Sequence, residues 1–222
     1  MLKKVIILIL SIPKILYLNF KTFEFKKAIY MPIIIKYNVK VKEIHKKCIE
    51  LRNWDKEHYR IKFGFGGSKH ISPNRYTILS IGKQGKIIFS GKAEFGEGCS
   101  IRCDFGKLTF GKNFSANKNC CINCEYAINI GNDVLLGWNI NFRDTDGHQI
   151  FVNEQGSELQ KNIIIGNHVW ICSYVDILKG AQIGDNSVVA WKSLVLKKFE
   201  NNNVLIGGSP AKVIKKIDDW KI

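Results

Sequence analysis

The chain has 222 residues, of which 45% are hydrophobic, 24% are charged and only 4 are proline. This composition is ordinary for a soluble globular domain with a short appendage, and it argues against extensive disorder. The formal net charge is +15.

The charge is concentrated in the first quarter of the chain. Residues 1–60 contain 14 Lys/Arg against 5 Asp/Glu, whereas residues 61–222 contain 20 against 14. Such asymmetry indicates either an anionic partner or a solvated lysine-rich surface. We expect no nucleic-acid binding, because the sequence contains no recognised motif or aromatic stacking pattern for it.

The first predicted element is an amphipathic helical segment over residues 1–30. Its apolar stretch, from Val5 to Phe20, is interrupted by Pro13 and is shorter than the roughly 20 residues of a membrane-spanning helix. It also lacks a small-residue cleavage site for a signal peptidase. Two alternatives remain: a helix lying on a membrane surface, or one docked on its own domain or on a partner subunit.

Residues 31–200 form the predicted main domain. Strands are expected at 39–44, 59–65, 76–81 and 86–89, as irregular coils that end at about residue 90.

A six-residue period then becomes the strongest signal in the chain. Aliphatic residues recur every six positions from Ile165 to Val195, and small or branched residues follow four positions after them. An earlier block keeps the same rhythm between Phe95 and Phe142, with Cys99 and Cys120 in the small-residue position. A period of six fits neither a helix nor a simple alternating strand, and it predicts a solenoid of stacked parallel coils with one continuous apolar column.

The seven cysteines have no regular spacing that would indicate a disulfide framework or a zinc site. We expect them to be small buried hydrophobic residues in a reducing compartment, and we expect no metal. They are Cys48, Cys99, Cys103, Cys120, Cys121, Cys124 and Cys172.

Two segments depart from the repeat. Residues 149–161 interrupt it and predict a protruding loop, a common location for functional residues on a rigid scaffold. Residues 201–222 leave the solenoid, and 213–217 together with Trp220 are expected to form a closing cap.

The segments Ala116–His148 and Ile165–Ile214 resemble the hexapeptide-repeat acyltransferases, most closely the sugar and surface-polysaccharide O-acetyltransferases. The motifs that carry the resemblance are IGNDVLLGWNINFRDTDGH, IGNHVWICSYVDILKGAQIGDNSVVAWKSLVLKK and GGSPAKVIKKI. The resemblance implies an all-β, left-handed parallel β-helix, a homotrimer with active sites between subunits, and acetyl-CoA as co-substrate.

His148 is the candidate catalytic base. A histidine titrates near pH ~6.5, so it can accept a hydroxyl proton and return it near neutrality. The residue closes the run Arg143 to Gly147, where the repeat gives way to the loop. The segment resembles the family at its catalytic histidine. The other histidines are weaker candidates, and His168 is expected to be exposed on a corner.

The resemblance also implies contacts with the acceptor. Asn117 and Glu125 match positions that contact the sugar, although Asn117 can equally be a corner residue with a left-handed backbone. Glu125 stands where the family has an aspartate. Asp146 is a further candidate for the substrate site, and either Asp144 or Asp146 can orient the imidazole.

The remaining candidates concern the acyl and CoA sites. Trp170 matches a tryptophan near the acyl or acceptor site, but packing on the solenoid explains it equally well. Trp191 departs from the usual small residue and is expected to narrow the groove for the pantetheine arm. The implied CoA contacts are Ser173, Ala190, Trp191, Lys197, Lys198 and Lys212.

The resemblance implies transfer of an acetyl group from acetyl-CoA to a sugar hydroxyl of a bacterial surface polysaccharide or its precursor. The protein is expected in the cytoplasm, and its N-terminus is a candidate for peripheral contact with the inner membrane face. Two alternatives remain open: N-acetylation of an amino sugar or antibiotic, and a non-catalytic trimeric scaffold.

Overall fold

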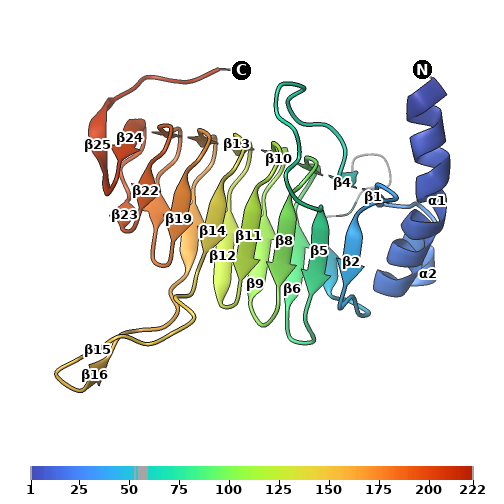
Figure 1. Cartoon of the computed structure of the whole chain (residues 1–222), viewed down its shortest axis with the longest axis horizontal. Helices are drawn as coiled ribbons and strands as arrows, with labels where there is room; N and C mark the ends of the chain where they lie inside the picture. The colour runs from blue at the N-terminus through green and yellow to red at the C-terminus, as the bar shows by residue number, and fades with distance from the viewer. Residues whose placement is uncertain (1, 53, 55–59, 222) are drawn as a thin grey trace.

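A computed structural model describes residues 2–52, 54 and 60–221 of the chain. Its main body is a three-sided prism built from short, mostly parallel strands (Figure 1). His58, and Tyr59 of the strand expected at 59–65, lie outside the described residues.

Each side of the prism is one sheet. Sheet A has nine strands: β1 (Ile33–Ile35), β4 (Ile61–Phe63), β7 (Ala93–Phe95), β10 (Phe114–Ala116), β13 (Leu135–Leu136), β18 (Trp170–Ile171), β21 (Val188–Val189), β24 (Val204–Gly208) and β25 (Ala211–Lys216). Sheet B has seven: β2 (Lys40–Lys42), β5 (Ile78–Ile81), β8 (Ser100–Cys103), β11 (Cys121–Cys124), β14 (Asn141–Arg143), β19 (Asp176–Leu178) and β22 (Leu194–Val195). Sheet C has seven: β3 (Ile49–Leu51), β6 (Lys86–Phe89), β9 (Lys107–Phe110), β12 (Ala127–Ile130), β17 (Ile163–Ile165), β20 (Gln182–Ile183) and β23 (Lys198–Phe199).

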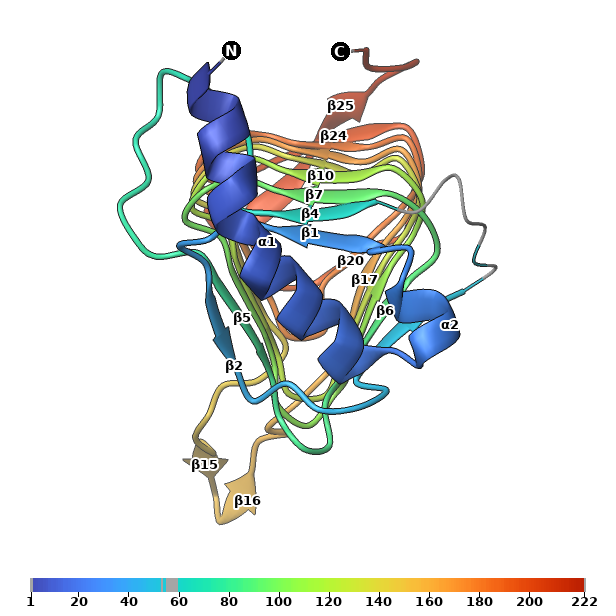
Figure 2. The ribbon, with the colours of Figure 1, turned by 90° about the vertical axis from the view of Figure 1, so that its right-hand side faces the viewer.

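The chain visits the sheets in the order A, B, C and then returns to A. Figure 2 looks along the prism from its N-terminal end, and the backbone turns anticlockwise as it recedes. The solenoid is therefore a left-handed parallel β-helix. Its strands pair in register with the coil above, as Ile165 pairs with Ile183 and Ile171 pairs with Val189, three hexapeptides later.

The six-residue period marks the core. The aliphatic residues from Ile165 to Val195 and the small residues that follow them, such as Ala181 and Ser187, are at most 2% exposed. The earlier block is equally buried, and it adds a column of stacked rings in which Phe63 lies 4.5 Å from Phe95 between ring centroids. Removal of this apolar surface from water is the main driving force that holds the coils together.

The corners of the prism need a left-handed backbone. Positive φ angles occur at turns between strands, and seven of the fourteen described non-glycine residues that adopt them are Asn or Asp, which tolerate this conformation better than other non-glycine residues. The corner asparagine at the end of β10 is Asn119, with φ 62°, and not Asn117. The interpretation of Asn117 as a left-handed corner residue is therefore wrong.

Both ends of the solenoid carry additional elements. Helix α1 (Leu2–Thr22) crosses the N-terminal end of the prism and is followed by the short α2 (Phe25–Ala28), as Figure 2 shows. At the other end, β24 and β25 form an antiparallel hairpin. The tail then runs back over sheet A, where the indole Nε1–H of Trp220 donates to the carbonyl of His168 at 2.8 Å.

The helix is longer than the apolar stretch indicated. Residues Val5–Thr22 are long and apolar enough to cross a membrane by length and composition. The expectation that this segment is too short to span a membrane is thus corrected, because Lys21 and Thr22 continue the helix past Phe20. Strands β1 and β3 were not expected either, since three residues are too few to display a period.

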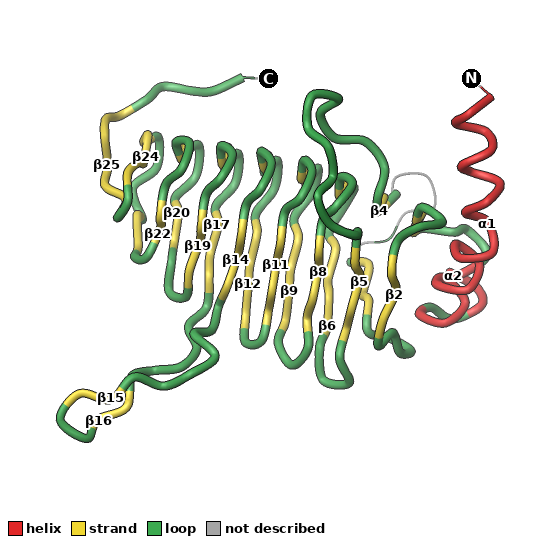
Figure 3. Tube along the Cα trace, viewed as in Figure 1, coloured by secondary structure: helices red, strands yellow, loops and turns green. Residues whose placement is uncertain are grey.

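The interruption of the repeat is a long hairpin. Strands β15 (Phe151–Val152) and β16 (Gln155–Gly156) pair at its tip, far from the body of the prism (Figures 1 and 3). The hairpin leaves after β14 and returns before β17. It therefore projects from the edge between sheets B and C, called the B–C edge below.

Candidate functional site

The residues predicted from the sequence divide between two edges of the prism. Each strand of sheet B starts at the A–B edge, where sheets A and B meet, and ends at the B–C edge. The A–B edge carries Asn117, Ser173, Ala190 and Trp191. The B–C edge carries Glu125, Asp146, His148, Lys197 and Lys198. A full strand of sheet B separates the two groups within one chain.

His148 lies at the root of the hairpin and is exposed. It follows Gly147, whose φ of +76° turns the chain outward and is strained for any other residue. Within the described part of the chain, the imidazole makes no hydrogen bond or ion pair. Both ring nitrogens therefore remain available to a substrate.

Asp144 fixes the start of this hairpin. Its carboxylate is fully buried and accepts two backbone hydrogen bonds of 2.9 Å, from the N–H groups of Glu125 and Tyr126. Its own carbonyl accepts from the N–H of Lys161 at 3.0 Å, on the returning limb. Asp144 thus holds both limbs to the neighbouring coil. Glu125 itself is half-buried at the same corner.

Asp146 is held by a lysine from the next coil. Its Oδ2 lies 2.7 Å from Nζ of Lys179, which also donates to the carbonyl of Glu158 on the returning limb. Lys179 therefore cross-links the two limbs of the hairpin at the level of His148. The sequence offered no sign of this role, since Lys179 lies more than thirty positions away from Asp146.

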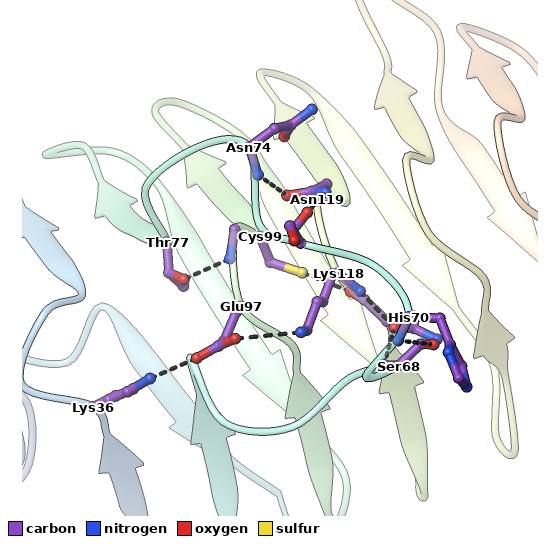
Figure 4. A network of polar contacts seen from close by, with 12 residues as sticks. Lys36, Ser68, His70, Asn74, Thr77, Glu97, Cys99, Lys118 and Asn119 are labelled. Carbon is purple, nitrogen blue, oxygen red and sulfur yellow. Dashed lines mark hydrogen bonds and ion pairs between the residues drawn. The ribbon is translucent and has the colours of Figure 1, made fainter. Parts of the chain in front are cut away.

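At the A–B edge, Asn117 anchors a loop. Its Oδ1 accepts from the backbone N–H of Ser68 and of Lys118, both at 2.8 Å. Asn119 holds the same loop farther along, by accepting from the N–H of Asn74 at 3.0 Å (Figure 4). It also donates to the carbonyl of Ser72 at 3.1 Å. The side-chain oxygen of Asn117 is therefore already engaged within this chain.

A partly buried ion-pair group lies beneath that loop. Glu97 contacts Lys36 at 2.5 Å and Lys118 at 3.4 Å (Figure 4). Burial opposes ionisation of this carboxyl, but hydrogen bonds and charge attraction from the two lysines outweigh it and lower the pKa of Glu97.

Ser173 does not present its hydroxyl to the surface. The residue is 3% exposed, and its Oγ accepts from the backbone N–H of Trp138 at 3.0 Å. The expected contact of this side chain with a pantetheine arm is therefore not supported by its position. Ala190 remains half-buried beside it, with its N–H bonded to Ile206.

An aromatic ridge occupies the same edge. Trp191 is 49% exposed and packs against Tyr174 at 5.0 Å and edge-on against Trp138 at 5.6 Å between ring centroids. Trp138 and Trp191 occupy the same position of the six-residue repeat, because each lies two positions after an inward aliphatic residue, Leu136 or Val189. This shared position is the sequence signal that the two rings lie on the same edge. Sequence reasoning singled out only Trp191.

Trp170 belongs to neither edge. It lies on the outer face of sheet A, 6.0 Å from Trp220 of the tail between ring centroids. His168 stacks on the same indole at 4.3 Å between ring centroids, and its side chain keeps 42% of its surface exposed. In this chain both residues help to hold the tail.

The three lysines predicted for CoA phosphates are exposed but dispersed. Lys197 and Lys198 flank the B–C edge, and Lys198 faces Glu200 at 3.7 Å. Lys212 lies on β25, opposite Gly207.

The seven cysteines are free thiols, and five of them are buried. The hydrogen bond with Cys103 and burial together raise the pKa of Cys124, and burial raises that of Cys120. Among the described residues, no group of three His, Cys, Asp or Glu side chains could hold a metal ion.

No protein-family model matches the chain. It is 32% identical over 154 residues to a galactoside O-acetyltransferase of Lactococcus lactis, covering 66% of this chain and 73% of that enzyme. It is 37% identical over 124 residues to a polysialic acid O-acetyltransferase of Neisseria meningitidis, covering 55% of this chain and 58% of that enzyme. The chain spans little more than half the length of several other curated acetyltransferases that it matches.

The fold is shared with a solved structure. The crystal structure of the polysialic-acid-specific acetyltransferase NeuO has a TM-score of 0.53 and 22% identity, covering 90% of this chain and 89% of that chain. Fold and repeat therefore place the chain among left-handed β-helix proteins. Within that class, it belongs to the hexapeptide-repeat acetyltransferases of the sugar O-acetyltransferase type.

Proposed function

We propose that the protein transfers an acetyl group from acetyl-CoA to a sugar hydroxyl, with His148 as general base. The observation that carries this proposal is the position of His148: its exposed imidazole bonds to no described residue and lies at the root of a hairpin that Asp144 and Lys179 hold in place. The names of the matched relatives support sugar acetylation as the reaction class.

In the proposed reaction the imidazole takes the proton of the acceptor hydroxyl, and the oxygen attacks the thioester carbonyl. The tetrahedral intermediate then collapses, the carbon–sulfur bond breaks, and the imidazolium returns its proton to the departing CoA sulfur. The products are a sugar acetate ester and CoA thiol. No covalent enzyme intermediate is needed, which fits the burial of most of the cysteines.

The division of the predicted residues between two edges favours a site formed by two chains. A homotrimer with parallel prisms would bring the A–B edge of one subunit against the B–C edge of the next. His148 would then face the groove beside Ala190 and Trp191 of its neighbour, and Lys197, Lys198 and Lys212 would be available for phosphates.

We place the reaction in the cytoplasm, at the inner face of the membrane, with a surface polysaccharide (capsule, O-antigen or exopolysaccharide) or its precursor as acceptor. The basic N-terminal quarter and the polysialic-acid-acetylating relative support this choice.

The test is CoA thiol release from acetyl-CoA with a panel of glycan acceptors. We expect release that depends on the acceptor and falls by at least ~100-fold in His148→Ala, the lower range for loss of a general base. His168→Ala serves as the matched control. An unchanged rate of CoA release in His148→Ala would refute the assigned base. If no acceptor raised CoA release in the wild type, a non-catalytic scaffold would be favoured. Mild base separates an ester product from the amide of an N-acetyltransferase.

Subunit mixing tests the shared site. Ala190→Trp is designed to block the groove at the A–B edge, whereas His148→Ala disables the B–C edge. Mixed trimers of the two inactive variants should recover about a quarter of the sites, because only a site with both intact edges works. Absence of any recovery would argue for a site within one chain.

A further inference from the structure

Helix α1 has an apolar outer face and a mixed inner face. The face that packs on the prism buries the polar Ser11, Asn19 and Thr22 together with Ile15 and Leu18. The residues that face outward are apolar and 41–57% exposed: Val5, Ile6, Leu8, Ile9, Leu10, Ile12, Leu16, Tyr17 and Phe20. A helix on the surface of a soluble protein has the opposite arrangement.

The polar contacts fix the helix in this orientation. Asn19 exchanges hydrogen bonds with the backbone of Ile33, donating to its carbonyl at 2.8 Å and accepting from its N–H at 3.2 Å. The ammonium of Lys14 donates to the carbonyls of Tyr37 and Val39. These bonds tie α1 to β1 and the corner that follows it, so the apolar face cannot turn inward.

The width of the outward face points to lipid as its occupant. At about 100° per residue, the outward residues cover an arc of about 200° around the helix. A single partner helix needs an apolar stripe roughly half as wide, whereas a bilayer surface can cover the whole exposed arc.

The charges around the helix complement an anionic surface. Helix α1 contains no Asp or Glu. Beside its C-terminal end, a depression of about 440 Å³ is lined by Phe20, Lys21, Phe23, Glu24, Phe25 and Lys46, and Phe25 is 71% exposed. Lysines beside protruding aromatic side chains suit phosphate head groups at the level where acyl chains begin.

We infer that α1 is an in-plane anchor for anionic phospholipid membranes, with the prism standing end-on above the bilayer. Figures 1 and 2 show the helix lying across the end of the prism, so its outer face is the lowest surface of the molecule in that orientation. A spanning helix is disfavoured, because it would carry Lys14 and Asn19 into the hydrocarbon and uncover the core beneath. The inference extends the proposed function by placing an acetylation site beside lipid-borne glycans.

The test is flotation of the full chain with vesicles, which does not require enzymatic activity. We expect binding to phosphatidylglycerol-containing vesicles at least about tenfold tighter than to phosphatidylcholine vesicles. Ile9→Glu/Leu16→Glu should abolish binding, and Lys21→Glu/Lys26→Glu should remove the preference for anionic lipid. Phe105→Glu, which changes another exposed aromatic residue (64%), should bind like the wild type.

Three results would overturn the inference. The first is no binding by the wild type. The second is resistance of the bound protein to alkaline carbonate, which would indicate a spanning helix. The third is a loss of oligomers in the Ile9/Leu16 variant without vesicles, which would make the face a protein interface. Thermal melting of each variant verifies that its prism is folded. Acetyl transfer by the wild type to soluble acceptors does not depend on vesicles, so it is measured independently of these outcomes and the two proposals fail separately.

Discussion

The ammonium of Lys179 lies 2.7 Å from the carboxylate of Asp146 and joins the hairpin to the coil that follows it. This ion pair is only two residues from His148. The side chain of Lys179 is 19% exposed, so the pair is partly shielded from water.

Replacement of Lys179 by Met should therefore loosen the hairpin without unfolding the prism. We expect kcat to fall by about tenfold, because a misplaced base costs rate even when the protein remains folded. Steady-state kinetics and limited proteolysis of the hairpin measure the two effects. Lys161→Met is the matched control, since it removes the more exposed pair with Glu158. Equal losses in both variants would contradict the assignment.

Trp191 should restrict the acyl chain that the groove accepts. In Trp191→Ala the aromatic ridge loses its outermost ring, so we expect the kcat/KM ratio of butyryl-CoA to acetyl-CoA to rise by about tenfold, within the 1–3 kcal/mol of a filled apolar pocket. Trp170→Ala, on the outer face of sheet A, should leave the ratio unchanged. An unchanged ratio in Trp191→Ala would place the groove elsewhere.

Asp144 should matter for stability. Asp144→Ala leaves the N–H groups of Glu125 and Tyr126 without their buried acceptor, which should lower the free energy of unfolding by on the order of 3 kcal/mol. Urea denaturation measures the change, and Asp104→Ala, at a half-buried carboxylate on the same edge, is the control. If the free energies of unfolding of the two variants differed by less than about 0.5 kcal/mol, water would be replacing the carboxylate as the acceptor of these two N–H groups.

Glu97 gives stability a specific pH dependence. Its folded-state pKa is lowered by Lys36 and Lys118 against the effect of burial. The contribution is therefore fully present above the unfolded pKa of about 4.3 and is lost as pH falls through the lower folded value. Urea midpoints of the wild type and Glu97→Gln should differ near pH 6 and converge toward pH 3. Parallel curves would contradict the ion-pair assignment.

The thiols should be slow to react in the native state. Burial raises the pKa of Cys48, Cys121 and Cys172, so little thiolate exists at pH 7. A chromogenic disulfide reagent should label the native protein slowly, first at the half-buried Cys121 and Cys172, and should titrate all seven cysteines after denaturation. Rapid labelling of Cys120 or Cys124 would contradict their burial.

The repeat was predictable because the buried residues of a solenoid recur at a fixed, short interval along the sequence. Every inward position from Ile165 to Val195 follows from a six-residue count, and so does the burial of Cys99 and Cys120. Strands β1 and β3 were missed, since isolated three-residue strands are defined by pairing with later coils and not by their own pattern.

The candidate site was less predictable because it depends on contacts between distant segments. The engagement of Asn117 with Ser68, the burial of the Ser173 hydroxyl under Trp138, and the link from Lys179 to Asp146 all join positions at least thirty residues apart. Family resemblance located the histidine, but it carried no information about which polar groups this chain uses internally.

The hairpin also shows where a solenoid tolerates added chain. Phe110 pairs with Ile130 twenty positions later, yet Ile130 pairs with Ile165 across the inserted segment, in the same alignment. The prism thus accommodates an insertion at one of its edges without any change in the register of the strand pairs. Loops that choose an acceptor can therefore lengthen and diversify during evolution while the scaffold and its folding remain unchanged.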